Sequence, residues 1–162
     1  MTNIPNKKEV LLPRLLAAPF SLLPDPVHSR LIVLALNRAL AEQLRDGELD
    51  FLQDRCIVIA VRDADINFRL SFDGNRLTTH PQSRTADLTI AGTVYDFLLM
   101  ISRQEDPDTL VFQRRLVMQG DTELGLQVKN FLDGLDVESL GVYRKMESLL
   151  KRALPLYRQV FG

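Results

Sequence analysis

The segment at residues 66–72, INFRLSF, alternates strictly between apolar and polar side chains, and it constrains the fold more than any other part of the chain. Alternation with a period of two is typical of a β-strand that buries one face and exposes the other to water. The Asp-Gly-Asn sequence at 73–75 tolerates a positive φ and indicates a tight turn into a short strand near 76–80. The sequence therefore predicts a β-hairpin.

Three more segments have strand character. The segment at 55–63, RCIVIAVRD, is apolar on both faces, as a central strand is. ADLTIAG at 86–92 repeats the alternation, and RRLVMQG at 114–120 is a further candidate. Because successive strands joined by tight turns pair antiparallel, we expect a sheet of about five strands that is mainly antiparallel.

Helical periodicity accounts for most of the other apolar residues. Residues 27–45 have one apolar face and end near Gly47. Residues 93–104 begin with a capping box of Thr93 and Asp96, and their expected inward stripe is Val94, Phe97, Leu98 and Ile101. Helices of this kind cover one face of an antiparallel sheet, so the predicted fold class is α+β.

The stretch at 106–135 has the most regular apolar spacing in the chain. Asp106 and Pro107 begin a short helix or turn, and Asp121 caps a helix that starts at Thr122. The apolar face of this last helix consists of Leu124, Val128, Phe131, Leu132 and Leu135.

Composition restricts the class of protein. A chain of 162 residues with 46% hydrophobic and 25% charged residues suits one compact domain. The net charge of −1 gives no reason to expect a nucleic-acid partner, which usually requires a basic excess. The single cysteine, Cys56, cannot form an internal disulfide, so we expect a reducing compartment, the cytoplasm.

Both ends of the chain differ from the part between them, and we divide the chain into an arm at 1–27, a domain at 28–136 and a C-terminal helix and tail at 137–162. Prolines interrupt the arm, and its apolar runs are shorter than the roughly 20 residues that a membrane-spanning helix needs. It either lies on an apolar groove or membrane surface or covers its own domain.

The C-terminal segment at 137–162 reads as an amphipathic helix from 137 to about 154, which Pro155 disrupts, and a tail. It has five basic and two acidic residues. We hypothesise that Lys145, Lys151 and Arg152 face the anionic inner membrane, which would make the protein peripheral there. An ordinary solvated helix face is the other reading of the same residues.

The sequence shows little catalytic chemistry. His28 and His80 are far apart and have no cysteine or carboxylate at metal-ligand spacing. The chain lacks the G-x-S-x-G elbow of serine hydrolases and the Gly-rich phosphate loops. Acids in RDADI at 62–66 and QEDPD at 104–108 are placed as helix caps and turn residues. We therefore predict that the protein is not an enzyme and binds no metal or cofactor.

The residues at 106–136, DPDTLVFQRRLVMQGDTELGLQVKNFLDGLD, together with DGELDFL at 46–52, resemble the sterol carrier protein 2 family. The resemblance spans residues 30–135 and implies a sheet and helices that enclose an apolar tunnel for lipid. The long run at 113–130 is similar to a bacterial branch of that family whose members are accessory factors in ubiquinone biosynthesis. That branch implies a non-catalytic lipid binder for the oxygen-independent pathway, which would present polyprenylated quinone precursors to hydroxylases that carry iron–sulfur clusters.

Candidate lipid-binding residues follow from the apolar stripes, although a stripe that packs a core and one that contacts a lipid look alike in sequence. They are Leu36, Leu40, Phe97, Ile101, Phe112, Leu124, Val128, Phe131 and Leu135. Arg114 and Arg115 are candidates for holding an anionic head group. Because adjacent residues on a strand point to opposite faces, we expect at most one of them to reach the mouth of a tunnel.

Two other functions fit the same residues. The tunnel of a phospholipid or fatty acyl transfer protein would need the same apolar lining and an arginine at its mouth. A non-lipid protein adaptor would use the apolar surface to recruit partners, and a densely packed interior would favour it.

Overall fold

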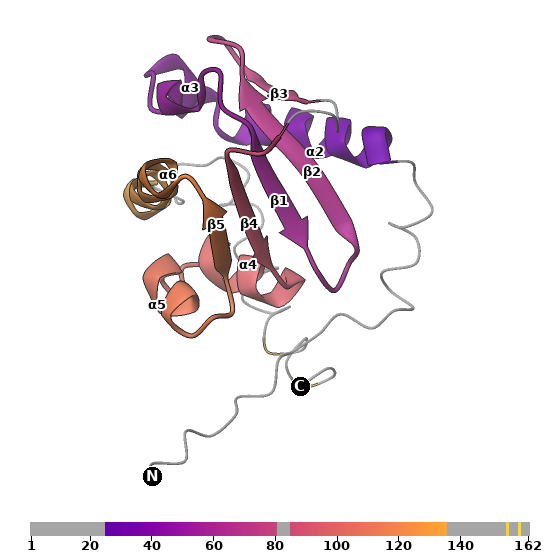
Figure 1. Cartoon of the computed structure of the whole chain (residues 1–162), viewed down its shortest axis with the longest axis vertical. Helices are drawn as coiled ribbons and strands as arrows, with labels where there is room; N and C mark the ends of the chain where they lie inside the picture. Colours follow the sequence, from indigo (N-terminus) through magenta and orange to yellow (C-terminus); the bar gives the residue numbers. More distant parts are fainter. Residues whose placement is uncertain (1–24, 81–84, 136–154, 156–158, 160–162) are drawn as a thin grey trace.

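The computed structural model describes residues 25–80 and 85–135 together with Pro155 and Gln159. A five-stranded sheet in the order β3-β2-β1-β4-β5 forms its centre (Figure 1). The strands are β1 (Ile57–Val61), β2 (Ile66–Phe72), β3 (Leu77–Thr79), β4 (Leu88–Gly92) and β5 (Val117–Gly120). The position of β1 in the middle of the sheet confirms the expectation drawn from its two apolar faces.

The predicted hairpin is present as the antiparallel pair β2 and β3, in which Leu70 lies opposite Thr79. Its turn is closed by Asp73, whose Oδ1 accepts hydrogen bonds of 2.9 Å from the backbone N–H groups of Asn75 and Arg76. Gly74 adopts a φ of 91°, a conformation that glycine reaches without strain. Local turn chemistry therefore produces the hairpin.

The sheet is mixed rather than a simple meander. After β3, the chain returns to the far side of β1, where β4 pairs parallel to it with Ile57 beside Leu88. The other three pairings are antiparallel. The expectation that consecutive strands lie side by side is wrong at this point, because alternation reveals the faces of a strand but not its neighbours.

The helices are α2 (Asp25–Ala39), α3 (Ala41–Arg45), α4 (Val94–Ile101), α5 (Pro107–Phe112) and α6 (Thr122–Gly134), with a 3₁₀ turn, η1 (Asp50–Leu52). The single helix expected at 27–45 is in fact two helices. Leu40 separates them with φ −101° and ψ 21°, outside the helical region. In Figure 1, α2 lies along the β2–β3 side of the sheet, and α5 and α6 lie along the β5 side.

Three helix starts predicted from their capping residues are confirmed. Thr93 and Asp96 form the expected capping box of α4. Asp106 accepts from the N–H of Asp108 at the start of α5, and Asp121 accepts from Glu123 and Leu124 at the start of α6. Each cap satisfies backbone donors that a helix leaves without an internal partner.

The strand expected at 114–120 is shorter than predicted. It begins only at Val117, because residues 113–116 fold back on the end of α5. The N–H of Arg114 donates to the Val111 carbonyl and that of Arg115 to the Leu110 carbonyl. Arg114 consequently takes a left-handed φ of 59°, which is unusual for a residue other than glycine.

The outer edge of β3 is held by a side chain of α2. Asn37 donates from Nδ2 to the Leu77 carbonyl at 2.8 Å, and its Oδ1 accepts from the Leu77 N–H at 2.7 Å. One amide side chain thus satisfies both backbone groups of Leu77 that face away from β2, and it fixes α2 against the sheet.

One face of the sheet is apolar, because paired residues on neighbouring strands project to the same side. The register places on that face Ile57, Ile59, Val61, Ile66, Phe68, Leu70, Phe72, Leu77, Leu88, Ile90 and Met118. Residues of α2, α5 and α6 join this face in a single core cluster, among them Val33, Leu110 and Leu124. The prediction of an α+β fold with helices on one face of the sheet is confirmed.

The segments predicted as an arm at 1–27 and as a basic helix at 137–162 fall mostly outside the described residues. Residues 25–27 already belong to α2, so this helix includes the last three residues of the predicted arm. Of the C-terminal segment, only Pro155 and Gln159 are described. Lys145, Lys151 and Arg152 therefore remain predictions about a part of the chain that the structure does not describe.

Candidate lipid-binding site

The apolar side of the sheet is only partly sealed by the described helices. Ile59 lies on the central strand and Leu70 on its neighbour β2, so complete helical cover would bury both. Both are half-buried instead. Ile59 and Leu70 therefore keep part of their surface exposed, and a ligand could cover that surface.

Half-buried apolar side chains from several elements surround this part of the core. We call them the half-buried apolar set: Leu36, Leu44, Phe51, Ile59, Leu70, Phe97, Met100, Val111, Met118, Phe131, Leu132 and Leu135. They come from five helices, η1 and three strands and pack against one buried cluster. Phe51 of η1 and Phe131 of α6 meet with ring centroids 6.2 Å apart at an interplanar angle of 53°.

The predicted lipid-binding residues divide into three groups by exposure. Leu40, Leu124 and Val128 belong to the buried core. The half-buried apolar set includes Leu36, Phe97, Phe131 and Leu135, and these four remain candidates for ligand contact. Ile101 is 47% exposed and Phe112 is 90% exposed, so neither side chain lies in the interior.

The inward face of α4 differs from the predicted stripe. Tyr95, Leu99 and Ser102 are buried, and Asp96 between them is buried as well. The sequence VYDFLLMI is apolar nearly all round, so its spacing cannot distinguish one face from another. Tertiary contacts of the polar residues determine the rotation of this helix.

Arg115 supplies those contacts. Its Nε donates to Asp96 Oδ1 at 2.8 Å, and its guanidinium lies 5.7 Å from the centre of the Tyr95 ring. Glu105 adds a carboxylate oxygen 3.9 Å from Nη1. With only 14% of its side chain exposed, Arg115 is engaged by the protein itself.

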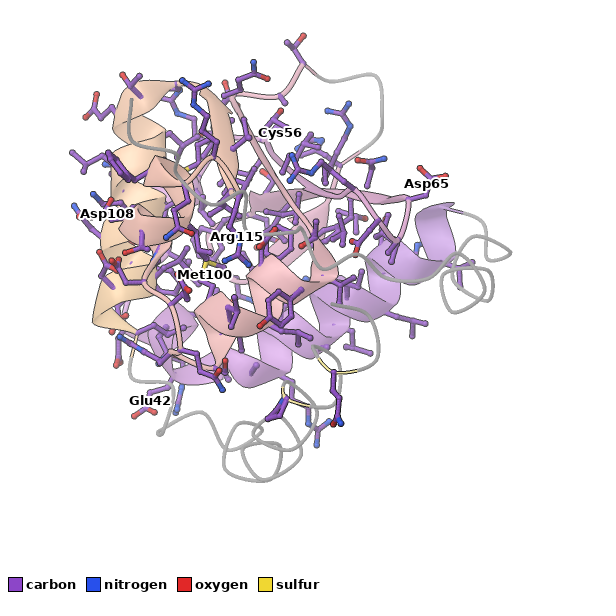
Figure 2. The ribbon with its side chains drawn as sticks, turned by 90° about the horizontal axis from the view of Figure 1, so that it is seen from below. Glu42, Cys56, Asp65, Met100, Asp108 and Arg115 are labelled. Carbon is purple, nitrogen blue, oxygen red and sulfur yellow. The ribbon has the colours of Figure 1, made fainter. Side chains whose placement is uncertain are left out.

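Arg114 is the opposite case, because it is exposed on the turn that follows α5. Neither arginine lies on a strand, so the argument that adjacent strand residues diverge does not apply to them. In Figure 2, Arg115 and Met100 are seen near the centre of the molecule, whereas Glu42, Asp65 and Asp108 are seen towards its edges.

Eight members of the half-buried apolar set were not among the predicted site residues although their segments were recognised, and four of them show why. Phe51 lies in the DGELDFL segment, and Ile59 and Leu70 lie on correctly predicted strand faces. Met100 was missed because the predicted stripe of α4 included Phe97 but placed Ile101, rather than Met100, one turn further on. Incomplete burial at the centre of a sheet is a tertiary property that periodicity does not report.

A second polar cluster joins the other end of the sheet. Arg55 lies 3.2 Å from Asp121 and 3.9 Å from Asp87, and Asp87 also accepts from the Cys56 N–H at 2.7 Å. The backbone N–H groups of Leu124 and Glu123, followed by the Arg55 charge, hold the pKa of Asp121 below its ordinary value. This cluster ties β4, β1 and α6 together and serves the fold.

Residues 25–80 and 85–135 contain no group of three or more His, Cys, Asp or Glu side chains that could hold a metal ion. Cys56 is completely buried. Of the helices that the structure describes, none has the length and apolar character needed to cross a membrane.

Comparison with known proteins agrees with this architecture. The profile of the SCP-2 sterol transfer family matches residues 35–133. The Ubiquinone biosynthesis accessory factor UbiT of Escherichia coli strain K12 is 40% identical over 128 residues, which are 79% of this chain and 73% of the relative. UbiT of Escherichia coli O157:H7 matches to the same extent.

Among solved structures, the UbiJ-SCP2 Ubiquinone synthesis protein superposes with a TM-score of 0.55 at 18% sequence identity. The superposition covers 67% of this chain and 95% of that one, and at this identity it shows a shared fold. The profile match covers the described sheet and helices from the middle of α2 to the end of α6. The chain belongs to the SCP-2 sterol transfer family.

Proposed function

We propose that this protein is a non-catalytic lipid-binding accessory factor of oxygen-independent ubiquinone biosynthesis. It binds a polyprenylated quinone precursor against the half-buried apolar set and presents the ring to partner hydroxylases. The observation that carries the proposal is the apolar surface left accessible at the centre of the sheet, at Ile59 and Leu70, in a chain 40% identical to UbiT.

The physical need for such a carrier comes from the isoprenoid tail. Each CH₂ group moved from water into an apolar environment contributes about 0.8 kcal/mol, so a long tail has negligible solubility by itself. Side chains such as Phe97, Phe131 and Leu132 still have apolar surface to lose to a ligand. Binding therefore removes apolar surface of both the protein and the lipid tail from water, and both contributions stabilise the complex.

The oxidative chemistry of the pathway belongs, in this proposal, to the partners. An iron–sulfur cluster needs several cysteine thiolates, and this sequence contains one cysteine, Cys56, which is buried. Hydroxylases that carry such clusters would act on the ring while this chain shields the tail. The protein would work in the cytoplasm and meet its cargo at the inner membrane.

Two measurements test the function. Organic extracts of the protein, purified from cells grown without oxygen, are examined by mass spectrometry, and a polyprenylated phenol or quinone is the expected ligand. Deletion of the gene should lower the ubiquinone pool of cells grown without oxygen and affect the aerobic pool less. Extracts free of isoprenoid together with an unchanged anaerobic pool would reject the proposal.

The same extracts decide between this function and phospholipid or fatty acyl transfer. An anionic head group would require a cation at the site, and Arg115 is already paired with Asp96. That pairing favours a ligand with an uncharged ring. Phospholipid as the sole bound lipid would reverse the assignment, and a lipid-free protein that still captures the hydroxylases would indicate an adaptor.

A further inference from the structure

Phe112 has the most exposed large apolar side chain among the described residues, with 90% of its surface accessible. It is the last residue of α5, and exposed Gln113 and Arg114 follow it in the turn. An isolated Phe in this position gains nothing from the fold, because it buries almost no surface.

A second exposed arginine lies against the same turn. Arg62 follows β1, and its Nη2 donates to the carbonyl oxygen of Arg115 at 3.1 Å. Arg115 is the next residue after Arg114, so two exposed arginines, one in this turn and one bound to it, lie close to Phe112 in the chain or in space. We call Arg62, Phe112, Gln113 and Arg114 the Phe112 corner.

The carboxylates near the Phe112 corner have partners elsewhere. Asp63 accepts from the Val94 N–H at 2.8 Å, and Asp108 lies 2.9 Å from Lys129. Asp106 caps α5. These carboxylates keep their charge, but Asp63 is held at the start of α4, and Asp106 and Asp108 lie at the first turn of α5 whereas Phe112 is its last residue. The corner itself therefore combines an apolar projection with two arginines, and it complements a surface that is anionic outside and apolar beneath.

We propose that the Phe112 corner docks the protein on an anionic lipid bilayer, with Phe112 inserted below the head groups and Arg62 and Arg114 against the phosphates. This inference rests on the proposed function, since a carrier must collect its lipid from a membrane. A lone ring is too small for the core of a protein interface, which buries roughly 800 Å² on each side. Paired copies of the corner would bring like charges together.

The chain contains no tryptophan, so a single substitution gives an unambiguous fluorescent reporter. Phe112→Trp is mixed with vesicles of equal parts phosphatidylcholine and phosphatidylglycerol, and with vesicles of phosphatidylcholine alone. We expect a blue shift only with the anionic vesicles, and strong quenching when their acyl chains carry bromine. Leu126→Trp on α6 and Leu34→Trp on α2 are the controls, at positions 52% and 66% exposed.

Charge is tested at Arg114, where the left-handed φ makes glycine the substitution least harmful to the fold. In the Phe112→Trp background, Arg114→Gly should weaken binding to the anionic vesicles about fivefold at low salt. Arg38→Gln, at an exposed position in the last turn of α2, is the control and should leave binding unchanged.

Three results would overturn the docking proposal: no blue shift or quenching at position 112, a response at Leu34→Trp in its place, or equal binding after Arg114→Gly. The identity of the extracted lipid is a separate measurement on the intact protein. Failure of docking with an isoprenoid in the extract would leave the carrier function standing. Insertion of position 112 with an extract free of isoprenoid and an unchanged anaerobic ubiquinone pool would leave docking standing and remove the carrier.

Discussion

Arg115 and Asp96 lie 19 residues apart in the sequence and form a hydrogen-bonded ion pair at 2.8 Å inside the protein. Only 14% of the Arg115 side chain and 4% of the Asp96 side chain are exposed. Asp96 also accepts from the N–H and the hydroxyl of Thr93 through its other oxygen. The pair therefore links the turn after α5 to the first turn of α4.

Removal of Arg115 should be costly, because it would leave the Asp96 carboxylate buried without its cation. We expect Arg115→Leu to lower the free energy of unfolding by about 3 kcal/mol. Urea denaturation of Arg115→Leu, Asp96→Asn and the double variant measures the coupling. A double variant as unstable as the sum of the two single variants would show that the residues do not stabilise each other.

Gly120 is required by the backbone of β5. Its φ is 126°, and a Cβ at this position would overlap the carbonyl oxygen of Asp87. Gly120→Ala should therefore destabilise the protein by more than about 2 kcal/mol. The matched control is Gly134→Ala at the end of α6, where no atom lies within 4 Å of the added Cβ. Thermal unfolding of both variants makes the comparison, and equal melting temperatures would contradict the argument.

The cap of α6 should make stability depend on pH in the acid range. Hydrogen bonds from the Leu124 and Glu123 N–H groups and the charge of Arg55 hold the pKa of Asp121 below its ordinary value of 3.8. A lowered pKa in the folded state stabilises the protein above the ordinary value, and this contribution is lost as the pH falls through the folded pKa. Asp121→Asn keeps a capping oxygen but does not titrate. We expect its unfolding free energy to fall less steeply below pH 4 than that of the unaltered protein, measured by urea titration at several pH values.

Loss of apolar contact at Phe131 should reduce lipid retention more than it affects folding. Phe131 is half-buried and faces Phe51, so Phe131→Ala should cost about 1–2 kcal/mol of stability. It should also lower the bound lipid severalfold, because part of the ligand's apolar surface loses its partner. Leu126→Ala on the exposed side of the same helix is the control and should retain the lipid. Quantitative extraction with circular dichroism of each variant separates binding from unfolding. Unchanged lipid in folded Phe131→Ala would exclude this residue from the site.

Local signals in the sequence were sufficient for the elements that local chemistry determines. The alternation at 66–72, the turn at 73–75 and the caps at Thr93, Asp106 and Asp121 each depend on residues close together in the chain. The parallel pairing of β1 with β4 depends instead on where the chain returns after β3. No periodicity encodes that choice, because both arrangements bury the same faces.

The candidate site was predictable only in part for the same reason. The stripe of α6 was correct because its polar residues define one outer face, as Leu124, Val128 and Phe131 show. The stripe of α4 was right at Phe97, which packs against the core, and wrong at Ile101, which is exposed. The buried Asp96, which pairs with Arg115, was not part of it. Exposure of Phe112 depends on the turn at Arg114, whose left-handed conformation has no signature in the residue type.

The amide of Asn37 also determines how this protein behaves at high concentration. An edge strand offers its free N–H and C=O groups as a template on which a strand of another molecule can add. At Leu77, both groups are already taken by a side chain of the same chain. At Leu77 the β3 edge therefore offers no free backbone group to a strand of another molecule. Growth of the sheet from molecule to molecule, the first step towards fibres, is blocked at this residue because the Asn37 amide makes the hydrogen bonds that an added strand would make.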